Sequence, residues 1–303
     1  MYTVYTTIIS PVEGGRKAIS KYILLPKISE RRERKKWYCT ESIKHPAKAQ
    51  IGIMQWILNK FCKDGEVILD PMVGIGTTLI EAIKLYPNTT AIGIEYESKF
   101  VKMTNDNINK AHRVALSDLF MRRRLGKAIC VQGDARELNE VFPGKVDRCI
   151  FSPPYSGTIR KGGEGPGVTA DPGRWKRVKD NLELRQGYSL DPKNIGNLRH
   201  GNINNIKSET YLSEMLKVYL QCYRVLGFGR SMILITKDFI SDKKRIPLTQ
   251  HTIVLCEMAG FKYITTYYRK IENPSFWRVL YQQKYPQVEQ IDSEDITVFN
   301  KMF

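Results

Sequence analysis

Short apolar segments alternate with helical patterns between residues 67 and 151, and this alternation restricts the possible folds most strongly. The segments VILD (67–70), TTAIGIEY (89–96), KAICVQGDA (127–135) and VDRCIF (146–151) have the length and composition of strands. The residues between them carry apolar side chains at helical spacing. Strands separated by helices usually run parallel, so we expect an α/β fold with a Rossmann-like, mostly parallel sheet and helices on both faces.

The pattern resumes after a long interruption. Residues 208–226 indicate a helix, GFGR (227–230) a turn and SMILITK (231–237) a strand, and a further helix and strand pair follow. The chain is therefore predicted to consist of a basic N-terminal extension (1–44) and one α/β domain (45–303). An irregular basic insert is expected at about 156–207, where glycine and proline are frequent.

The charge of the chain is strongly positive. Lys and Arg number 48 against 31 Asp and Glu, a formal net charge of +17, which favours a polyanion such as nucleic acid as partner. A merely basic enzyme is the alternative. The run SERRERKKWY (29–38) is equally typical of a solvated helical face and of a patch that contacts phosphates.

Cysteine usage and hydropathy point to a cytoplasmic protein. The six cysteines are scattered and do not cluster with the four histidines, so we expect free thiols and no metal site. The N-terminal residues lack the apolar core of a signal peptide, and no apolar run has the length of a membrane span. No membrane association is therefore predicted.

Polar residues at the strand ends outline a ligand site, because ligands of such sheets bind at the carboxyl ends of the strands. The loop DPMVGIGTT (70–78) has Gly74 and Gly76 for close backbone approach, and it lacks the lysine of a phosphate-binding P-loop. Glu95 ends the next strand, where a carboxylate can hold both ribose hydroxyls of an adenosine-type cofactor. Asp134 follows the third strand and is placed to accept a hydrogen bond from an exocyclic amine.

The segment FSPPYSG (151–157) ends the fourth strand in a rigid turn. Two consecutive prolines remove two backbone donors and fix two φ angles. Rigidity of this kind suits a ligand site. The alternative interpretation of the turn is a strand terminator with a surface tyrosine.

DPMVGIGTT followed by SPPY resembles the amino-methyltransferases that use S-adenosyl-L-methionine to methylate exocyclic amines of bases. HPAK (45–48) resembles the segment that precedes the cofactor loop in that family, and SPPY is its variant typical of cytosine N4. The resemblance implies a methyltransferase sheet and cytosine N4 as the acceptor. The implied catalytic residues are Ser152, Pro153, Pro154 and Tyr155. The implied cofactor-binding residues are Asp70, Pro71, Gly74, Gly76, Thr77, Glu95, Asp134 and His45.

The insert interleaves basic and aromatic residues, a composition suited to an unpaired strand whose bases stack while its phosphates are neutralised. The candidate nucleic-acid-binding residues are Arg160, Lys161, Trp175, Lys176, Arg177, Tyr188 and Arg199. Disorder without a role is the alternative. We expect His200 to be a surface histidine.

The sequence leaves the type of nucleic acid open. Few residues remain for a separate recognition domain, which favours structured RNA such as ribosomal RNA, where shape replaces sequence reading. Site-specific methylation of DNA, as in restriction-modification or phage enzymes, is nearly as well supported. A nucleic-acid-binding module without catalytic activity is the alternative from another class.

Overall fold

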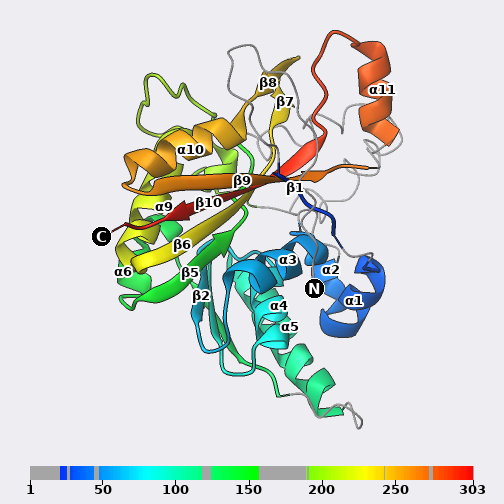
Figure 1. The fold of residues 1–303 in the computed structure, drawn as a ribbon, viewed down its shortest axis with the longest axis vertical. Coiled ribbons are helices and arrows are strands. Elements are labelled where there is room, and N and C mark those ends of the chain that lie inside the picture. Colours follow the sequence, from blue (N-terminus) through cyan, green and yellow to red (C-terminus); the bar gives the residue numbers. More distant parts are fainter. Residues whose placement is uncertain are drawn as a thin grey trace.

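The computed structural model describes residues 21–25, 28–43, 48–117, 124–156, 189, 191–241, 243–272 and 276–302. These residues form an eight-stranded sheet in the order β1-β9-β10-β6-β5-β2-β3-β4 and a separate hairpin of β7 and β8 (Figure 1). The sheet strands are β1 (Lys21–Tyr22), β2 (Val67–Asp70), β3 (Thr90–Glu95), β4 (Lys127–Gln132), β5 (Val146–Phe151), β6 (Leu226–Thr236), β9 (Lys262–Lys270) and β10 (Ser293–Asn300). The hairpin strands are β7 (Phe239–Ser241) and β8 (Lys244–Ile246).

Helices cover both faces of the sheet (Figure 1). The helices on one face are α3 (Ile51–Phe61), α4 (Thr77–Leu85) and α5 (Ser98–Ser117). Two N-terminal helices, α1 (Glu30–Trp37) and α2 (Thr40–Ile43), pack against α5. The helices on the other face are α6 (Leu138–Val141), α9 (Tyr211–Val225) and α10 (Leu248–Met258), with the short 3-10 turns η1 (Ala135–Glu137) and η2 (Ile195–Asn197). A last helix, α11 (Phe276–Lys284), connects β9 to β10.

Strand direction confirms the predicted fold class. β4, β3, β2, β5 and β6 run parallel, while β10 is antiparallel to both of its neighbours, β6 and β9. This is the mostly parallel, Rossmann-like sheet that the sequence predicted, with one reversed strand. The carboxyl ends of the five parallel strands meet at one edge, where ligands of such folds bind.

Alternation of side chains along the central strands builds two hydrophobic cores. Ile68 and Ile150 point into the core beneath α3, α4 and α5. Their neighbours Leu69 and Phe151 point into the core beneath α9 and α10. Successive side chains of a strand face opposite sides, so a strand buried on both faces is apolar throughout.

Two regions differ from the sequence expectations. The predicted turn GFGR (227–230) is part of β6. Main-chain hydrogen bonds extend the strand there: Gly229 N–H donates to the Lys301 carbonyl at 2.8 Å, and Lys301 N–H donates to the Arg230 carbonyl at 3.0 Å. In the basic run 29–38, Trp37 and Tyr38 are buried in the core, and the Tyr38 hydroxyl donates to Glu81 at 3.1 Å. The described part of the N-terminal segment therefore packs on the helical layer, and its boundary at residue 44 stays a prediction.

Other sequence expectations concern thiols and the membrane. All six cysteines are free, as predicted, and five of them are buried. Within the described ranges, no helix combines the length and the apolar character that crossing a bilayer requires.

Candidate active site

The loop after β2 is held in place by the Asp70 carboxylate. One carboxylate oxygen accepts the main-chain N–H of Met72 at 3.0 Å, and the other accepts the Thr78 hydroxyl at 2.5 Å. Asp70 is buried, and burial raises its pKa to about 7. The carboxyl group therefore links the end of β2 to the start of α4. Pro71 lies buried beside it, as does Thr77, which faces Tyr38 on the helical side instead of the loop.

The surroundings of Gly74 and Gly76, the two glycines of this loop, differ. Both have positive φ angles, +57° for Gly74 and +82° for Gly76. A Cβ on Gly74 would meet no heavy atom within 4 Å, so the loop presents open backbone there. A Cβ on Gly76 would lie 2.7 Å from Cγ2 of Thr104. Gly76 is thus required by the packing of α5, whereas Gly74 leaves room for a ligand.

Glu95, at the end of β3, is bound to the same loop. Its carboxylate accepts the main-chain N–H of Gly74 and that of Glu97, each at 2.9 Å. Burial raises the pKa of Glu95 to about 7. Glu95 and Asp70 thus lie at the ends of adjacent parallel strands, and both carboxylates bind the loop that contains Gly74.

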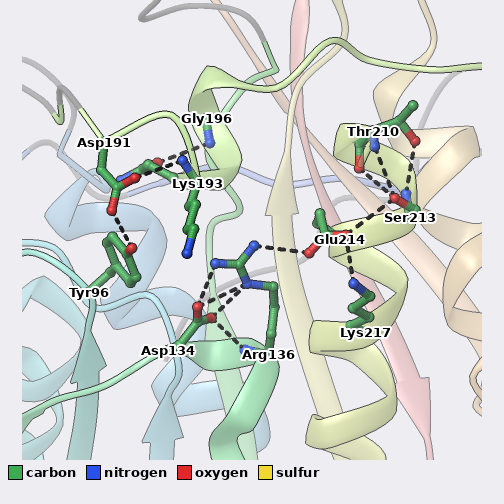
Figure 2. A network of polar contacts seen from close by, with 11 residues as sticks. Tyr96, Asp134, Arg136, Asp191, Lys193, Gly196, Thr210, Ser213, Glu214 and Lys217 are labelled. Carbon is green, nitrogen blue, oxygen red and sulfur yellow. Dashed lines mark hydrogen bonds and ion pairs between the residues drawn. The ribbon is translucent and has the colours of Figure 1, made fainter. Parts of the chain in front are cut away.

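Asp134, after β4, takes part in a chain of ion pairs that the sequence did not predict (Figure 2). Its carboxylate pairs with the Arg136 guanidinium at 2.5 Å, and Arg136 also contacts Glu214 of α9 at 2.9 Å. Nearby, the Tyr96 hydroxyl donates to Asp191, which raises the pKa of Tyr96 to about 12 (Figure 2). This hydrogen bond brings the end of the insert to the carboxyl end of β3.

The SPPY turn continues β5 at the same edge of the sheet. The Ser152 hydroxyl donates to the main-chain carbonyl of Ile235, on β6, at 3.0 Å. Pro153 is buried, whereas Pro154 and Tyr155 are half-buried. The Tyr155 ring packs edge-on against Phe239 with centroids 5.8 Å apart, and the Lys237 ammonium lies 5.9 Å from its centroid.

Behind the turn lies a polar chain of three side chains that sequence reasoning missed. The Ser156 hydroxyl contacts Nδ1 of His200 at 2.9 Å, and Nε2 of His200 contacts Nδ1 of His251 at 2.8 Å. Burial, followed by the nearby His251, lowers the pKa of His200 to about 4. The prediction of a surface histidine is therefore wrong, because His200 stacks on Tyr211 beneath the turn with ring centroids 5.5 Å apart. No short motif links these three residues in the sequence.

Most of the predicted nucleic-acid contacts lie outside the described residues, as does His45. The residues concerned are Arg160, Lys161, Trp175, Lys176, Arg177 and Tyr188. Arg199 is described, and its side chain is exposed next to His200. Its main-chain carbonyl accepts the N–H of Tyr211 at 2.7 Å, which fixes the start of α9.

The acceptor groups at this edge of the sheet fit S-adenosylmethionine. Two buried carboxyl groups, Asp70 and Glu95, end adjacent strands and can accept from an ammonium group and from ribose hydroxyls. Between them, the open backbone at Gly74 leaves space for a ligand. Asp134, the residue expected to accept from an exocyclic amine, has both carboxylate oxygens bound by Arg136.

Similar folds occur among solved structures at low sequence identity. TrmN from Thermus thermophilus matches with a TM-score of 0.44 and 14% identity, over 86% of this chain and 52% of that one. NSun6 from Pyrococcus horikoshii, solved with SFG, matches with a TM-score of 0.48 and 14% identity, over 95% of this chain and 61% of that one. A SAM-dependent methyltransferase from Methanosarcina mazei matches with a TM-score of 0.43 and 12% identity, over 82% of this chain and 97% of that one. This chain therefore spans about half the length of TrmN.

Sequence comparison gives the family. No curated protein matches the chain. The family model described as DNA methylase, of the N6/N4 methyltransferases, matches residues 13–106, which include the Asp70 loop and Glu95. The model described as RMKL-like methyltransferase domain matches residues 60–167, which include the SPPY turn. Both models describe methyltransferases, so residues 13–167 are similar to the N4/N6 amino-methyltransferase family.

Proposed function

We propose that this protein methylates the exocyclic N4 amine of cytosine in nucleic acid. The observation that carries the proposal is the hydrogen bond from the Ser152 hydroxyl to the Ile235 carbonyl. A hydroxyl has one hydrogen and two lone pairs, and here the hydrogen is directed to β6. The oxygen of Ser152 is thereby oriented as an acceptor, which is what an amine with two N–H groups requires.

The chemistry depends on the electronic state of the amine. The N4 lone pair of cytosine is delocalised into the ring, so the nitrogen is a poor nucleophile until its hydrogens are held out of conjugation. Ser152 Oγ and the Pro153 carbonyl can accept those two hydrogens and direct the lone pair away from the turn. S-adenosylmethionine, when bound, would supply an electrophilic methyl group, and its sulfur–methyl bond would break to leave S-adenosylhomocysteine. The nitrogen gains the methyl group and releases one proton to solvent.

The walls of the turn suit an extruded base. Tyr155 is half-buried and offers a ring for stacking, while its packing on Phe239 keeps that ring from turning. The two prolines fix the backbone between the acceptors and the ring. Serine at the first position of the tetrapeptide supports cytosine as the target, since aspartate or asparagine is typical where adenine N6 is methylated.

Structured RNA, such as ribosomal RNA, is the proposed substrate. An unpaired base in an RNA loop can enter the site without the cost of breaking a duplex, and a compact protein can read the fold of the loop by shape. DNA is the second candidate, favoured by the description of the family model that matches residues 13–106. The basic insert residues stay predicted contacts for either polymer. The free cysteines support a cytoplasmic location.

The test is a transfer assay with tritiated S-adenosylmethionine on total DNA and ribosomal RNA from cells that lack the gene. Nucleoside analysis of the labelled product distinguishes the outcomes. Label in N4-methylcytidine supports the proposal, and label in N4-methyldeoxycytidine supports the DNA alternative. Label in N6-methyladenosine or its deoxy form would contradict the assignment to cytosine. Absence of label with intact cofactor binding would favour the inactive binding module.

A further inference from the structure

Near the SPPY turn, two cations contact one carboxylate, and a third cation acts on one of them. Glu294, on β10, forms an ion pair of 2.8 Å with Arg269, on β9. The ammonium of Lys237, just after β6, lies 4.0 Å from the same carboxylate. The charge of Arg278, on α11, acts on Lys237 together with that of Arg269. We call Lys237, Arg269 and Arg278 the basic cluster.

The basic cluster carries more positive charge than Glu294 neutralises. The Lys237 side chain is only 22% exposed, and lysines this buried are normally paired with a carboxylate at close range. Here the nearest contact is at 4.0 Å, and that carboxylate is already bound by Arg269 at 2.8 Å. Burial, reinforced by the two guanidinium groups, lowers the pKa of Lys237. An additional anion would relieve this unbalanced charge.

The position of the basic cluster identifies the anion. The Lys237 ammonium lies 5.9 Å from the centroid of the Tyr155 ring. Lys237 also follows Ile235, whose carbonyl holds the Ser152 hydroxyl, by two residues. A base stacked on Tyr155 brings its own sugar and flanking phosphates to the side of that ring. The anion nearest to such a base is a backbone phosphodiester.

The donors of the basic cluster suit a phosphate. The ammonium of Lys237 has three donors, and Arg278 uses one of its guanidinium nitrogens in a long contact of 3.4 Å to the Ile291 carbonyl. Arg269 is held by Glu294 and contributes through its charge. Two side chains from different elements can thus converge on one phosphate, in the manner of other phosphate sites.

We propose that Lys237 and Arg278, supported by Arg269, bind a backbone phosphate of the nucleic acid next to the methylated base. The inference rests on the proposed function insofar as Tyr155 receives the base. It adds the residues that anchor the strand. Phosphate contacts fix position and carry no base specificity, so the basic cluster serves RNA and DNA alike.

Salt dependence of binding tests the proposal separately from catalysis. The probes are two fluorescein-labelled single strands of about 12 nucleotides with one central cytosine, one of RNA and one of DNA with the same sequence. Binding constants are measured by anisotropy for the wild type, Lys237→Gln, Arg278→Gln and the double variant. Each phosphate contact on a single strand contributes about 0.7 to the slope of log K against log salt. Because both side chains would neutralise the same phosphate, we expect the double variant to reduce the slope by about 0.7 and each single variant to reduce it by part of that amount.

A matched control removes a lysine far from the site. Lys127→Gln, at the amino end of β4, changes the net charge as Lys237→Gln does, and its side chain is exposed. Lys237→Arg keeps the charge and is expected to keep the slope. A reduced slope on either strand, absent in Lys127→Gln, supports the phosphate site. Slopes of Lys237→Gln and Arg278→Gln that equal that of Lys127→Gln on both strands would overturn it. Neither result depends on which methylated nucleoside the enzyme produces.

Discussion

The hydroxyl of Ser152 donates a 3.0 Å hydrogen bond to the carbonyl of Ile235, which ties the SPPY turn to β6. Ser152→Ala removes the acceptor proposed for the target amine and leaves the loops around Asp70 and Glu95 unchanged. We expect kcat to fall by about 10²-fold, while the Kd for S-adenosylmethionine stays within about twofold of the wild type. Single-turnover kinetics and calorimetry measure the two quantities.

The control for this substitution is Ser117→Ala. The Ser117 hydroxyl, at the end of α5, also donates to a main-chain carbonyl, that of Val114, at 3.1 Å. Its loss is expected to leave kcat unchanged. Equal losses of kcat and cofactor affinity in Ser152→Ala would show that the residue maintains the fold of the site and has no role at the amine.

Tyr155→Ala is expected to raise KM for the nucleic acid. Removing a stacking ring costs about 1–3 kcal/mol per base, which corresponds to about 5- to 150-fold in affinity. Tyr155→Phe keeps the ring that packs on Phe239 and is expected to retain most of the affinity. Tyr223→Ala is the matched control, because that ring also lies under a lysine, Lys301, at 4.6 Å. Unchanged oligonucleotide affinity in Tyr155→Ala would remove this residue from the base site.

The cofactor side of the site was predictable because its residues follow strands directly. Asp70 and Glu95 end β2 and β3, so their shared position at one edge follows from parallel pairing alone. The partner of Asp134 could not be predicted in this way. Arg136 is two residues away, but its second contact, Glu214, is 78 residues further along the chain. Only the packing of α9 against η1 brings that carboxylate close.

The His200 chain shows a second limit of sequence reasoning. Ser156, His200 and His251 come from the SPPY turn, from a segment without regular structure and from α10. A single histidine in a polar, glycine-rich segment is typical of a surface residue, and nothing local indicates its burial. The same holds for the basic cluster, since Lys237 follows β6, Arg278 lies on α11 and no local pattern in the sequence links them.

The two loop glycines are expected to respond differently to alanine. Both substitutions cost about 1 kcal/mol for the positive φ angle. Gly76→Ala also forces its Cβ to within 2.7 Å of Cγ2 of Thr104, so it should lower the free energy of unfolding further. Thr104→Ser removes that methyl group and keeps the hydroxyl that donates to the Gly74 carbonyl at 2.7 Å. The double variant is therefore expected to recover part of the loss in urea denaturation.

Gly74→Ala is the complementary case. Its Cβ meets no protein atom within 4 Å, so the loss of stability should be confined to the backbone contribution. Cofactor affinity should fall, because the Cβ occupies the space between Asp70 and Glu95. A variant with full affinity by calorimetry would place the cofactor elsewhere.

Cofactor binding is expected to depend on pH near neutrality. Burial raises the pKa of both Asp70 and Glu95 to about 7, so both carboxyl groups become protonated below that pH. An ionised carboxylate is the stronger acceptor for ammonium and hydroxyl groups. The affinity for S-adenosylmethionine should therefore fall below pH 7, by up to about tenfold per pH unit for each carboxylate that must ionise. Glu95→Gln should bind more weakly at pH 8 and show a flatter profile, and Glu140→Gln, at an exposed position on α6, serves as control.

Stability in mild acid is expected to depend on His200. Its pKa is lowered to about 4, so the folded protein resists a proton that the unfolded chain accepts below about pH 6.5. The contribution of His200 is thus fully present above that pH and is lost as the pH falls toward 4. Asp70 and Glu95 have raised pKa values, and their contribution changes in the opposite direction, being lost as the pH rises toward 7. The pH dependence of the wild-type free energy of unfolding therefore does not by itself report the contribution of His200.

The difference between the wild type and His200→Phe does isolate it. Phenylalanine keeps a ring to stack on Tyr211 but cannot contact Ser156 or His251. We expect the free energy of unfolding of the variant, relative to the wild type, to fall more at pH 7, where neutral His200 makes both hydrogen bonds, than at pH 5. Urea denaturation at the two pH values measures this, with His112→Phe on α5 as control. A loss that is the same at both pH values would show that His200 contributes by packing alone.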